Sequence, residues 1–255
     1  MDDHTVVGRV MAIIDATLAA NDPVSLADLS RLTEIPKPTA RRLAMNLTSR
    51  GLLHKSDAGY SPGPRLADLG ARAAERNGFR TLSEPYLQEM FERTRGVIWL
   101  VELRPAEHLT TLVTAVFDRT SLPYSNEWPR KLDNPSILAT ALGLVALTDD
   151  PRTVETHLRR GIPKLTRHTP DQPRQVLAAL ARAAGDVLAV EHEQVHLGWS
   201  CLAIPITGPG SANAVLGVVD RTARFNLGRL RHTALTAAAG IGKEWRERDA
   251  RAPST

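Results

Sequence analysis

The sequence has almost no cysteine and no long apolar run. Cys201 is the only cysteine among 255 residues, so no disulfide can form within the chain, which is typical of proteins from a reducing compartment. No stretch comes near the roughly 18 apolar residues that a membrane-spanning helix needs, and the first residues, MDDHTVVGRV, lack the features of a signal peptide. These absences exclude a disulfide scaffold and a membrane span, and they predict a cytoplasmic protein.

The motifs of several enzyme classes are absent as well. The sequence has no Ser nucleophile elbow, no phosphate-binding Gly loop and no dinucleotide-binding fingerprint. Its 42% hydrophobic and 24% charged residues are typical of a globular protein of one or two domains. We therefore expect neither an enzyme nor a resident cofactor. The net charge of +4 says little by itself, because the distribution of charge along the chain decides what it can bind.

One stretch does match a catalytic pattern. Residues 192–196 read HEQVH, and HExxH supplies two zinc ligands and a general base in many metalloproteases. The motif needs a helix, because histidines four residues apart then share one face and reach one metal. Strand-like runs at 186–191 and 200–206 enclose the motif, and Gly198 disfavours a helix between them. The sequence therefore favours a polar connection between two strands.

A third zinc ligand is missing too. Trp199 and Leu202 stand where the extended metalloprotease motif has Gly and His. We expect no metal site, and we keep as the alternative a zinc-dependent hydrolase that uses His192, Glu193 and His196.

The first 36 residues predict two short helices. The first carries apolar residues at three- and four-residue spacing, namely Val7, Val10, Met11, Ile14 and Leu18. Ser25 caps the second, with Asp28 as an acidic partner in its first turn. The apolar residues of this second helix are Leu26, Leu29 and Leu32. A tight break follows at residues 34–36, because Pro36 disfavours a helical residue before it.

Residues 37–50 predict a third helix, and residues 52–61 predict a small hairpin. One helix face is apolar and consists of Ala40, Leu43, Ala44 and Leu47, and Gly51 ends the helix. The opposite face carries Thr39, Arg41, Arg42, Met45, Asn46 and Ser49. Two short helices joined by a tight turn and followed by a hairpin have the anatomy of a winged helix-turn-helix.

The charge changes sign along this segment. Residues 1–36 hold two basic and six acidic residues, whereas residues 37–65 hold six basic residues and one acidic residue. A DNA backbone attracts such a basic patch, and Arg also reads guanine edges in the major groove. The alternative is a solvated helix face. We predict base contacts from Thr39, Arg41, Arg42 and Asn46, and phosphate contacts from Lys37, Lys55 and Arg65.

Three stretches of the chain resemble the IclR family of bacterial transcriptional regulators. They are SLADLSRLTEIPKPTARRLAMNLTSRGLLHKSDAGYSPGPRLADLG, SILATALGLVALTDD and AVEHEQVHLGWSCLAIPI, and they follow one another in the family's order. The resemblance implies that HEQVHLGWSC forms an acidic loop, a Gly and then a strand with Cys, with no zinc. It also implies a GAF-like sensing domain after the winged helix-turn-helix.

The remaining pattern predicts an α+β fold, with an antiparallel sheet flanked by helices. Strands are expected at Val97–Leu103, at Leu109–Phe117 and near 187, 202 and 216, with Val97, Trp99, Val101 and Leu103 on one sheet face. Helices are expected at 66–77, 85–93, 136–147, 153–160, 174–184 and 227–246, the last capped by Asn226. Together with what the resemblance implies, we expect a DNA-binding domain at 1–65, a linker helix at 66–78 and a GAF-like effector-binding domain at 79–250.

The resemblance implies an effector pocket lined by Ala141, Leu142, Glu191, Cys201, Gly217 and Val219. In the better-known members of the family that this chain resembles, Ser stands at the positions of Gly217 and Val219. This chain therefore lacks two hydroxyl donors. This departure favours a larger or more apolar ligand, such as an aromatic one, over a compact hydroxy- or keto-acid, with Trp99 and Trp128 as walls. Glu191 suits a ligand with a hydrogen-bond donor. The alternative is that Trp99 and Cys201 only fill a core.

Together these features predict a regulator that binds double-stranded DNA and responds to a small-molecule effector. A homodimer, or a dimer of dimers, would bind a palindromic operator whose half-sites lie roughly 34 Å or a multiple apart. The effector would act by binding two conformations unequally. The alternative is a regulator whose second domain has lost its ligand and only oligomerises.

Overall fold

Residues 5–104, 109–117, 132, 134–210 and 213–251 are described by a computed structural model of the chain. The chain separates into two units, Met1–Asn77 and Gly78–Thr255. The first unit has one apolar core and the second has two, one on each face of a sheet. No described helix is both long and apolar enough to cross a membrane.

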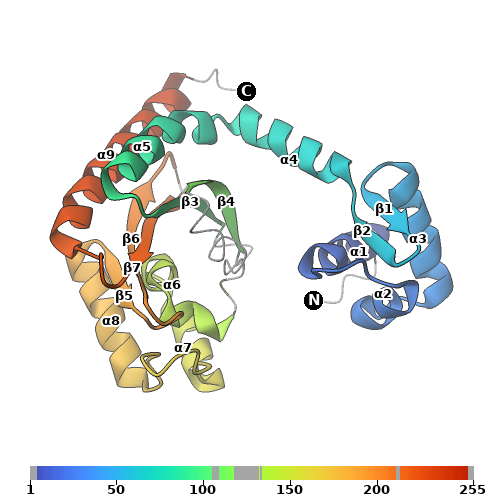
Figure 1. Cartoon of the computed structure of the whole chain (residues 1–255), viewed down its shortest axis with the longest axis horizontal. Helices are drawn as coiled ribbons and strands as arrows, with labels where there is room; N and C mark the ends of the chain where they lie inside the picture. The colour runs from blue at the N-terminus through green and yellow to red at the C-terminus, as the bar shows by residue number, and fades with distance from the viewer. Residues whose placement is uncertain (1–4, 105–108, 118–131, 133, 211–212, 252–255) are drawn as a thin grey trace. The chain divides into compact units, whose positions relative to one another are not determined.

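The first unit is a winged helix-turn-helix followed by a helix (Figure 1). Its elements are α1 (Val6–Ala19), α2 (Leu26–Thr33), α3 (Lys37–Ser49), β1 (Leu53–Ser56), β2 (Gly59–Pro62) and α4 (Pro64–Asn77). The predicted cap of α2 is confirmed, because the Ser25 hydroxyl accepts from the Asp28 amide at 3.1 Å and donates to the Asp28 carboxylate at 2.7 Å. Both interactions hold the start of α2 in place.

The core of this unit confirms the apolar face of α3 and corrects that of α1. Ala40, Leu43, Ala44 and Leu47 are all buried, as predicted. In α1 the buried residues are Ile13, Ile14 and Thr17, whereas Val7, Met11 and Leu18 are exposed. The apolar stripe of α1 is wider than the core that it meets, so the core covers only one side of it. In α2, Leu29 is buried, whereas Leu32 is exposed.

The predicted hairpin is confirmed and is joined to the segment before α2. Strands β1 and β2 pair antiparallel from Leu53↔Pro62 to Ser56↔Gly59. Tyr60 and Val24 exchange two backbone hydrogen bonds of 2.7 and 2.9 Å. Gly59 is required there, because its φ is +142° and a Cβ would collide with the Val24 backbone. The wing is therefore held by the same core that positions α3.

The second unit is built on a five-stranded antiparallel sheet with strand order β4-β3-β7-β6-β5. The strands are β3 (Val97–Arg104), β4 (Leu109–Val116), β5 (Ala189–His192), β6 (Trp199–Thr207) and β7 (Asn213–Arg221). Helices α5 (Phe79–Thr94) and α9 (Leu227–Arg251) pack on one face (Figure 1). The other face packs against the 3₁₀ helix η3 (Pro135–Ala139), α6 (Ala141–Ala146), α7 (Pro151–Arg160) and α8 (Pro173–Asp186).

Alternation along β3 separates the two cores of this unit. Val97, Trp99 and Val101 are buried towards α6, and Leu103 packs partly against the same cluster. Ile98 and Leu100, in contrast, are buried towards α5 and α9. The predicted shared face of the four odd-numbered residues is therefore confirmed.

The predicted helix at 136–147 is interrupted. Thr140 has an extended backbone, with φ −103° and ψ 147°, and separates η3 from α6. Its hydroxyl accepts from the Gly143 amide at 2.9 Å and so begins a new helix. The helix expected at 85–93 instead begins at Phe79, and the last helix continues to Arg251. Asn226 does cap that helix, by accepting from the Arg229 amide at 3.0 Å.

Candidate nucleic-acid interface and interior site

The exposed face of α3 is the candidate interface of the first unit. Its neighbours in sequence explain its position, because Pro36 precedes the helix and Pro38 occupies its first turn, where no backbone N–H is needed. Arg41, Arg42 and Asn46 are exposed, opposite the buried apolar face. Neither arginine forms an ion pair with any residue that the structure describes. Their charges are thus available to a partner.

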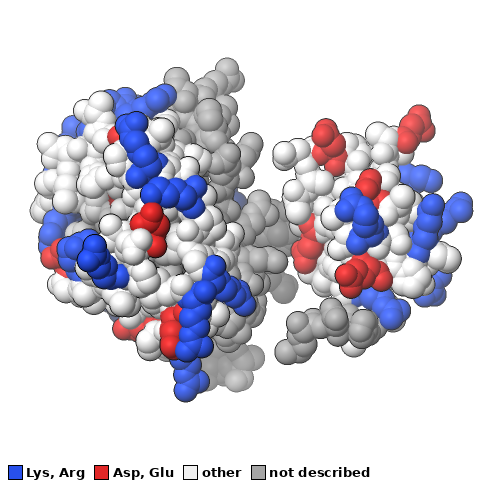
Figure 2. Space-filling view, turned by 90° about the horizontal axis from the view of Figure 1, so that it is seen from below, with Lys and Arg blue, Asp and Glu red and all other residues white. Residues whose placement is uncertain are grey.

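The other candidate residues of this unit surround that face. Lys37 begins α3 and is exposed, and Lys55 is exposed on β1. Arg65 is exposed at the start of α4, and its guanidinium donates to the Arg50 carbonyl at the end of α3 at 3.2 Å. Thr39, which was predicted on the exposed face of the helix, is half-buried. In the smaller unit of Figure 2, much of the Lys and Arg surface gathers along one edge.

Strand register brings the predicted interior residues together in the second unit. Glu191 pairs with Cys201, and Cys201 pairs with Val219. In the next row Trp99 pairs with Gly217. Ala141 and Leu142 begin α6 and belong to the same buried cluster as Trp99, Cys201 and Val219. Trp128 lies outside the described residues. Residues from five separate elements thus share one interior face.

Glu191 is the ionisable carboxyl of this interior site. It is only 6% exposed, and burial raises its pKa to about 7, although it accepts hydrogen bonds from the Gln194 and Val195 amides, which favour the charged form. The Gln194 amide lies 2.9 Å from the carboxylate. Because this pKa lies near neutrality, the carboxyl can act there as donor or acceptor towards a neighbour.

The Cys201 thiol remains protonated. Burial raises its pKa well above the ordinary value, and the nearby Glu191 charge raises it further. A hydrogen bond from Trp99 acts in the opposite direction but does not offset the burial. Since the thiolate is the nucleophile in cysteine chemistry, this thiol is an apolar wall of the site rather than a reactive group.

The HEQVH segment is a strand end followed by a tight loop, as favoured from the sequence. His192 ends β5, and Glu193 has a left-handed backbone with φ +56°. The His192 ring interacts with the Ser200 hydroxyl at 3.0 Å. Among the residues described, no cluster of three His, Cys, Asp or Glu side chains could hold a metal ion. Nothing therefore supports the zinc-hydrolase alternative.

This loop is held against the segment before α8 by two threonines, neither of which was among the predicted site residues. Thr166 donates to the Glu193 carbonyl at 2.6 Å, and Thr169 donates to the Gln194 carbonyl at 2.6 Å. The Gln194 amide then reaches Glu191 inside. The only sequence signal is the turn-forming Thr-Arg-His-Thr-Pro at 166–170. The loop that covers Glu191 is therefore held from both sides.

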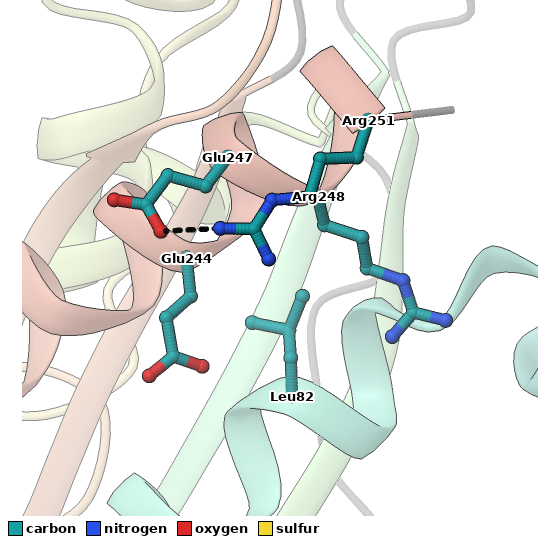
Figure 3. Close-up of a pocket in the computed structure, with 5 residues that line it drawn as sticks. All are labelled: Leu82, Glu244, Glu247, Arg248 and Arg251. Carbon is teal, nitrogen blue, oxygen red and sulfur yellow. Dashed lines mark ion pairs between the residues drawn. The ribbon is translucent and has the colours of Figure 1, made fainter. Parts of the chain in front are cut away.

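A groove lies on the opposite side of this unit, between α5 and the end of α9. Figure 3 shows its lining of Leu82, Glu244, Glu247, Arg248 and Arg251. Arg251 pairs with Glu247 at 3.6 Å, and Arg248 donates to the Gly78 carbonyl at 3.1 Å. The hydroxyl of Tyr86 donates to Glu244, whose carboxylate raises the pKa of Tyr86 to about 12. Each charged group that lines this groove therefore has a partner within the second unit.

Comparisons with known proteins agree with both units. The family model of the IclR helix-turn-helix domain matches residues 6–57. The Pca regulon regulatory protein of Pseudomonas putida is 23% identical over 235 residues, which cover 90% of this chain and 78% of that protein.

Solved structures share the fold over nearly the whole chain. An IclR homolog from Microbacterium hydrocarbonoxydans, crystallised with 4-hydroxybenzoate, has a TM-score of 0.79 and 21% identity, covering 95% of this chain and 100% of that one. The IclR transcriptional regulator of Alicyclobacillus acidocaldarius has a TM-score of 0.76 and 19% identity, covering 93% and 97%. The first unit thus contains a helix-turn-helix that matches the IclR family model, and the chain as a whole shares its fold with these solved structures.

Proposed function

We propose that this regulator binds a palindromic operator through α3 and is controlled by an aromatic acid bound in its second unit. In this proposal residues 1–65 bind DNA, residues 66–78 form the linker, and residues 79–250 bind the effector. The protein acts in the cytoplasm. The observation that supports DNA binding most directly is the exposed Arg41–Arg42 pair, on a helix whose other face is fully buried.

In this proposal the exposed face of α3 lies in the major groove. Thr39, Arg41, Arg42 and Asn46 contact base edges, and Lys37, Lys55 and Arg65 contact phosphates. Arg65 supports the geometry by its hydrogen bond to the end of α3, since this bond places a cation where the helix leaves the groove. An arginine that bonds a guanine in bidentate fashion contributes sequence preference, whereas a lysine at a phosphate contributes affinity alone.

A homodimer, or a dimer of dimers, explains an apolar surface on α1. Met11 is 49% exposed and Leu18 is 46% exposed. They line an open groove together with the end of the hairpin and the start of α4, including Pro62 and Leu66. A second copy that covers this groove would remove apolar area from water and place two α3 helices for two half-sites.

An aromatic acid is the effector class that the interior site and the relatives support together. The homolog from Microbacterium hydrocarbonoxydans was crystallised with 4-hydroxybenzoate. In this chain the interior site carries Trp99, a protonated Cys201 thiol and Glu191 with a pKa of about 7. Apolar walls suit a ring, and a protonated Glu191 can donate to a carboxylate or a hydroxyl.

The test of DNA binding is a double substitution with a matched control. Genomic fragments that the protein retains would supply the operator, and its affinity would be measured by fluorescence anisotropy at fixed salt. Changing Arg41 and Arg42 together to Ala should weaken operator binding at least about 30-fold, because two base contacts of roughly 1–3 kcal/mol each are lost. The control changes Arg159 and Arg160 of α7, an equally exposed adjacent pair in the second unit. Equal affinities for the two double variants would refute the assignment of α3.

A further inference from the structure

Trp99 and Gly217 form a matched pair at the centre of the interior face. They are direct cross-strand partners on β3 and β7. A Cβ built on Gly217 would overlap the Cζ2 and Cε2 atoms of the Trp99 indole. The backbone at Gly217 does not lie in the left-handed region that favours glycine. The indole, and not the backbone conformation, therefore requires glycine here.

The indole is enclosed within the core on this face of the sheet. Trp99 is only 2% exposed and belongs to the cluster that includes Ala141, Leu142 and Cys201. A side chain larger than glycine at 217 would displace the ring, and a smaller side chain at 99 would leave a void.

We propose that Trp99, whose indole packs against Gly217, determines the size of the effector that this regulator binds. The indole fills the interior next to β7, directly against Gly217. It also presents an apolar face where a hydroxyl-bearing side chain at 217 would bind a compact, oxygen-rich acid. This inference rests on the proposed function, because it assigns specificity within the proposed effector site.

The first experiment tests the packing without any effector. Thermal unfolding of full-length W99A is followed with and without added indole, which fits the space that the substitution vacates. Indole should raise the melting temperature of W99A by several degrees and leave that of the wild type unchanged. If W99A does not fold, W99L serves with benzene as the smaller probe. A melting temperature of the variant that neither probe raises would overturn the proposal.

A double-mutant cycle tests the pair itself. G217A should lower the melting temperature in the wild type but have little effect in W99A, because the clashing ring is gone. Two controls make the result specific. G185A introduces a Cβ with open space around it, and G217A in the W245A background retains the clash, because Trp245 belongs to the other core. Additive effects of W99A and G217A would overturn the pairing.

The specificity claim is tested by calorimetry with 4-hydroxybenzoate and 6-hydroxy-2-naphthoate. W99A should shift the affinity ratio towards the two-ring acid by about tenfold or more relative to the wild type, because the vacated volume admits the second ring. An unchanged ratio overturns the proposal. If indole stabilises W99A but neither protein binds either acid, the proposed effector class fails, and the specificity role fails with it while the Trp99–Gly217 packing stands. The two failures are thus distinguishable.

Discussion

The two units present their candidate residues in opposite ways. In the first, the residues lie on α3 and its immediate neighbours, and their side chains are polar or charged and mostly exposed. In the second, they come from β3, α6, β5, β6 and β7 and are buried. A residue such as Arg42 can therefore change without disturbing the fold, whereas Trp99 serves packing and any ligand at the same time. Binding and folding are separable in one unit and coupled in the other.

The largest predicted effect on stability distinguishes the two faces of α3. Leu47→Ala should destabilise the first unit by about 3 kcal/mol, because it empties part of a packed core. Met45→Ala, two residues away and 53% exposed, should change stability by less than about 0.5 kcal/mol. Hydrogen exchange measured by mass spectrometry on the whole chain would report each unit separately, which a single unfolding curve would not.

The expected pattern is faster exchange across α1–α3 in the Leu47 variant, with no change in the sheet of the second unit. Operator binding should then fall in the Leu47 variant through loss of folded α3. The Met45 variant should stay folded. Equal exchange in the two variants would contradict the separation of a packing face from a binding face on this helix.

A second effect, of similar size, concerns pH and the second unit. The Glu191 carboxyl has a folded pKa of about 7 against an ordinary value of 4.5, so the folded state binds more protons between these values. Its contribution to stability is complete below pH 4.5 and is lost as the pH rises through 7. The difference of 2.5 pKa units corresponds to roughly 3 kcal/mol. Glu191→Gln keeps an acceptor for the Gln194 amide and should remove this decline.

The difference between the pH-dependent stabilities of the wild type and of the variant gives the contribution of Glu191, which includes its repulsion from the Glu193 charge. Glu193→Gln is the matched control, because hydrogen bonding to the Gly198 amide lowers the pKa of Glu193. Its contribution has the opposite sign and is lost as the pH falls. Denaturant unfolding from pH 4 to pH 8 would measure both, and a Glu191→Gln profile parallel to the wild type would show that burial does not perturb this group.

The same contrast decides what could be predicted from sequence. The apolar row of α3 and the hairpin follow from spacing within one segment, and both were predicted correctly. The buried side of α1 was predicted only in part. Ile14 is buried and Val10 packs partly against the core, whereas the other residues of the apolar stripe are exposed, because the core covers only one side of it. Thr140 breaks a helix that looked continuous, since its hydroxyl caps α6. The Thr166 and Thr169 bonds join segments more than twenty residues apart, and no local periodicity contains such contacts.

The Trp99–Gly217 pair shows the same limit most clearly. Alternation along β3 placed Trp99 on the correct sheet face. Only the register of β3 against β7, which depends on the whole sheet, shows that it stands on Gly217. The sequence pattern therefore predicts the sheet face on which a residue lies, but not the residue that it pairs with on the neighbouring strand.

The smallest predicted effect, on DNA affinity, distinguishes phosphate contacts from base contacts within the exposed interface. Lys55 lies on the wing and is proposed to contact a phosphate, whereas Arg42 is proposed to contact a base. Lys55→Ala should weaken binding to operator and to unrelated DNA by the same few-fold factor and lower the slope of log affinity against log salt by about 0.9. Arg42→Ala should lower the ratio of operator to unrelated affinity as well. Anisotropy titrations at four salt concentrations on both DNAs would separate the two behaviours. If Lys55→Ala altered the ratio and left the slope unchanged, the wing would be reading bases, and sequence recognition would extend beyond α3.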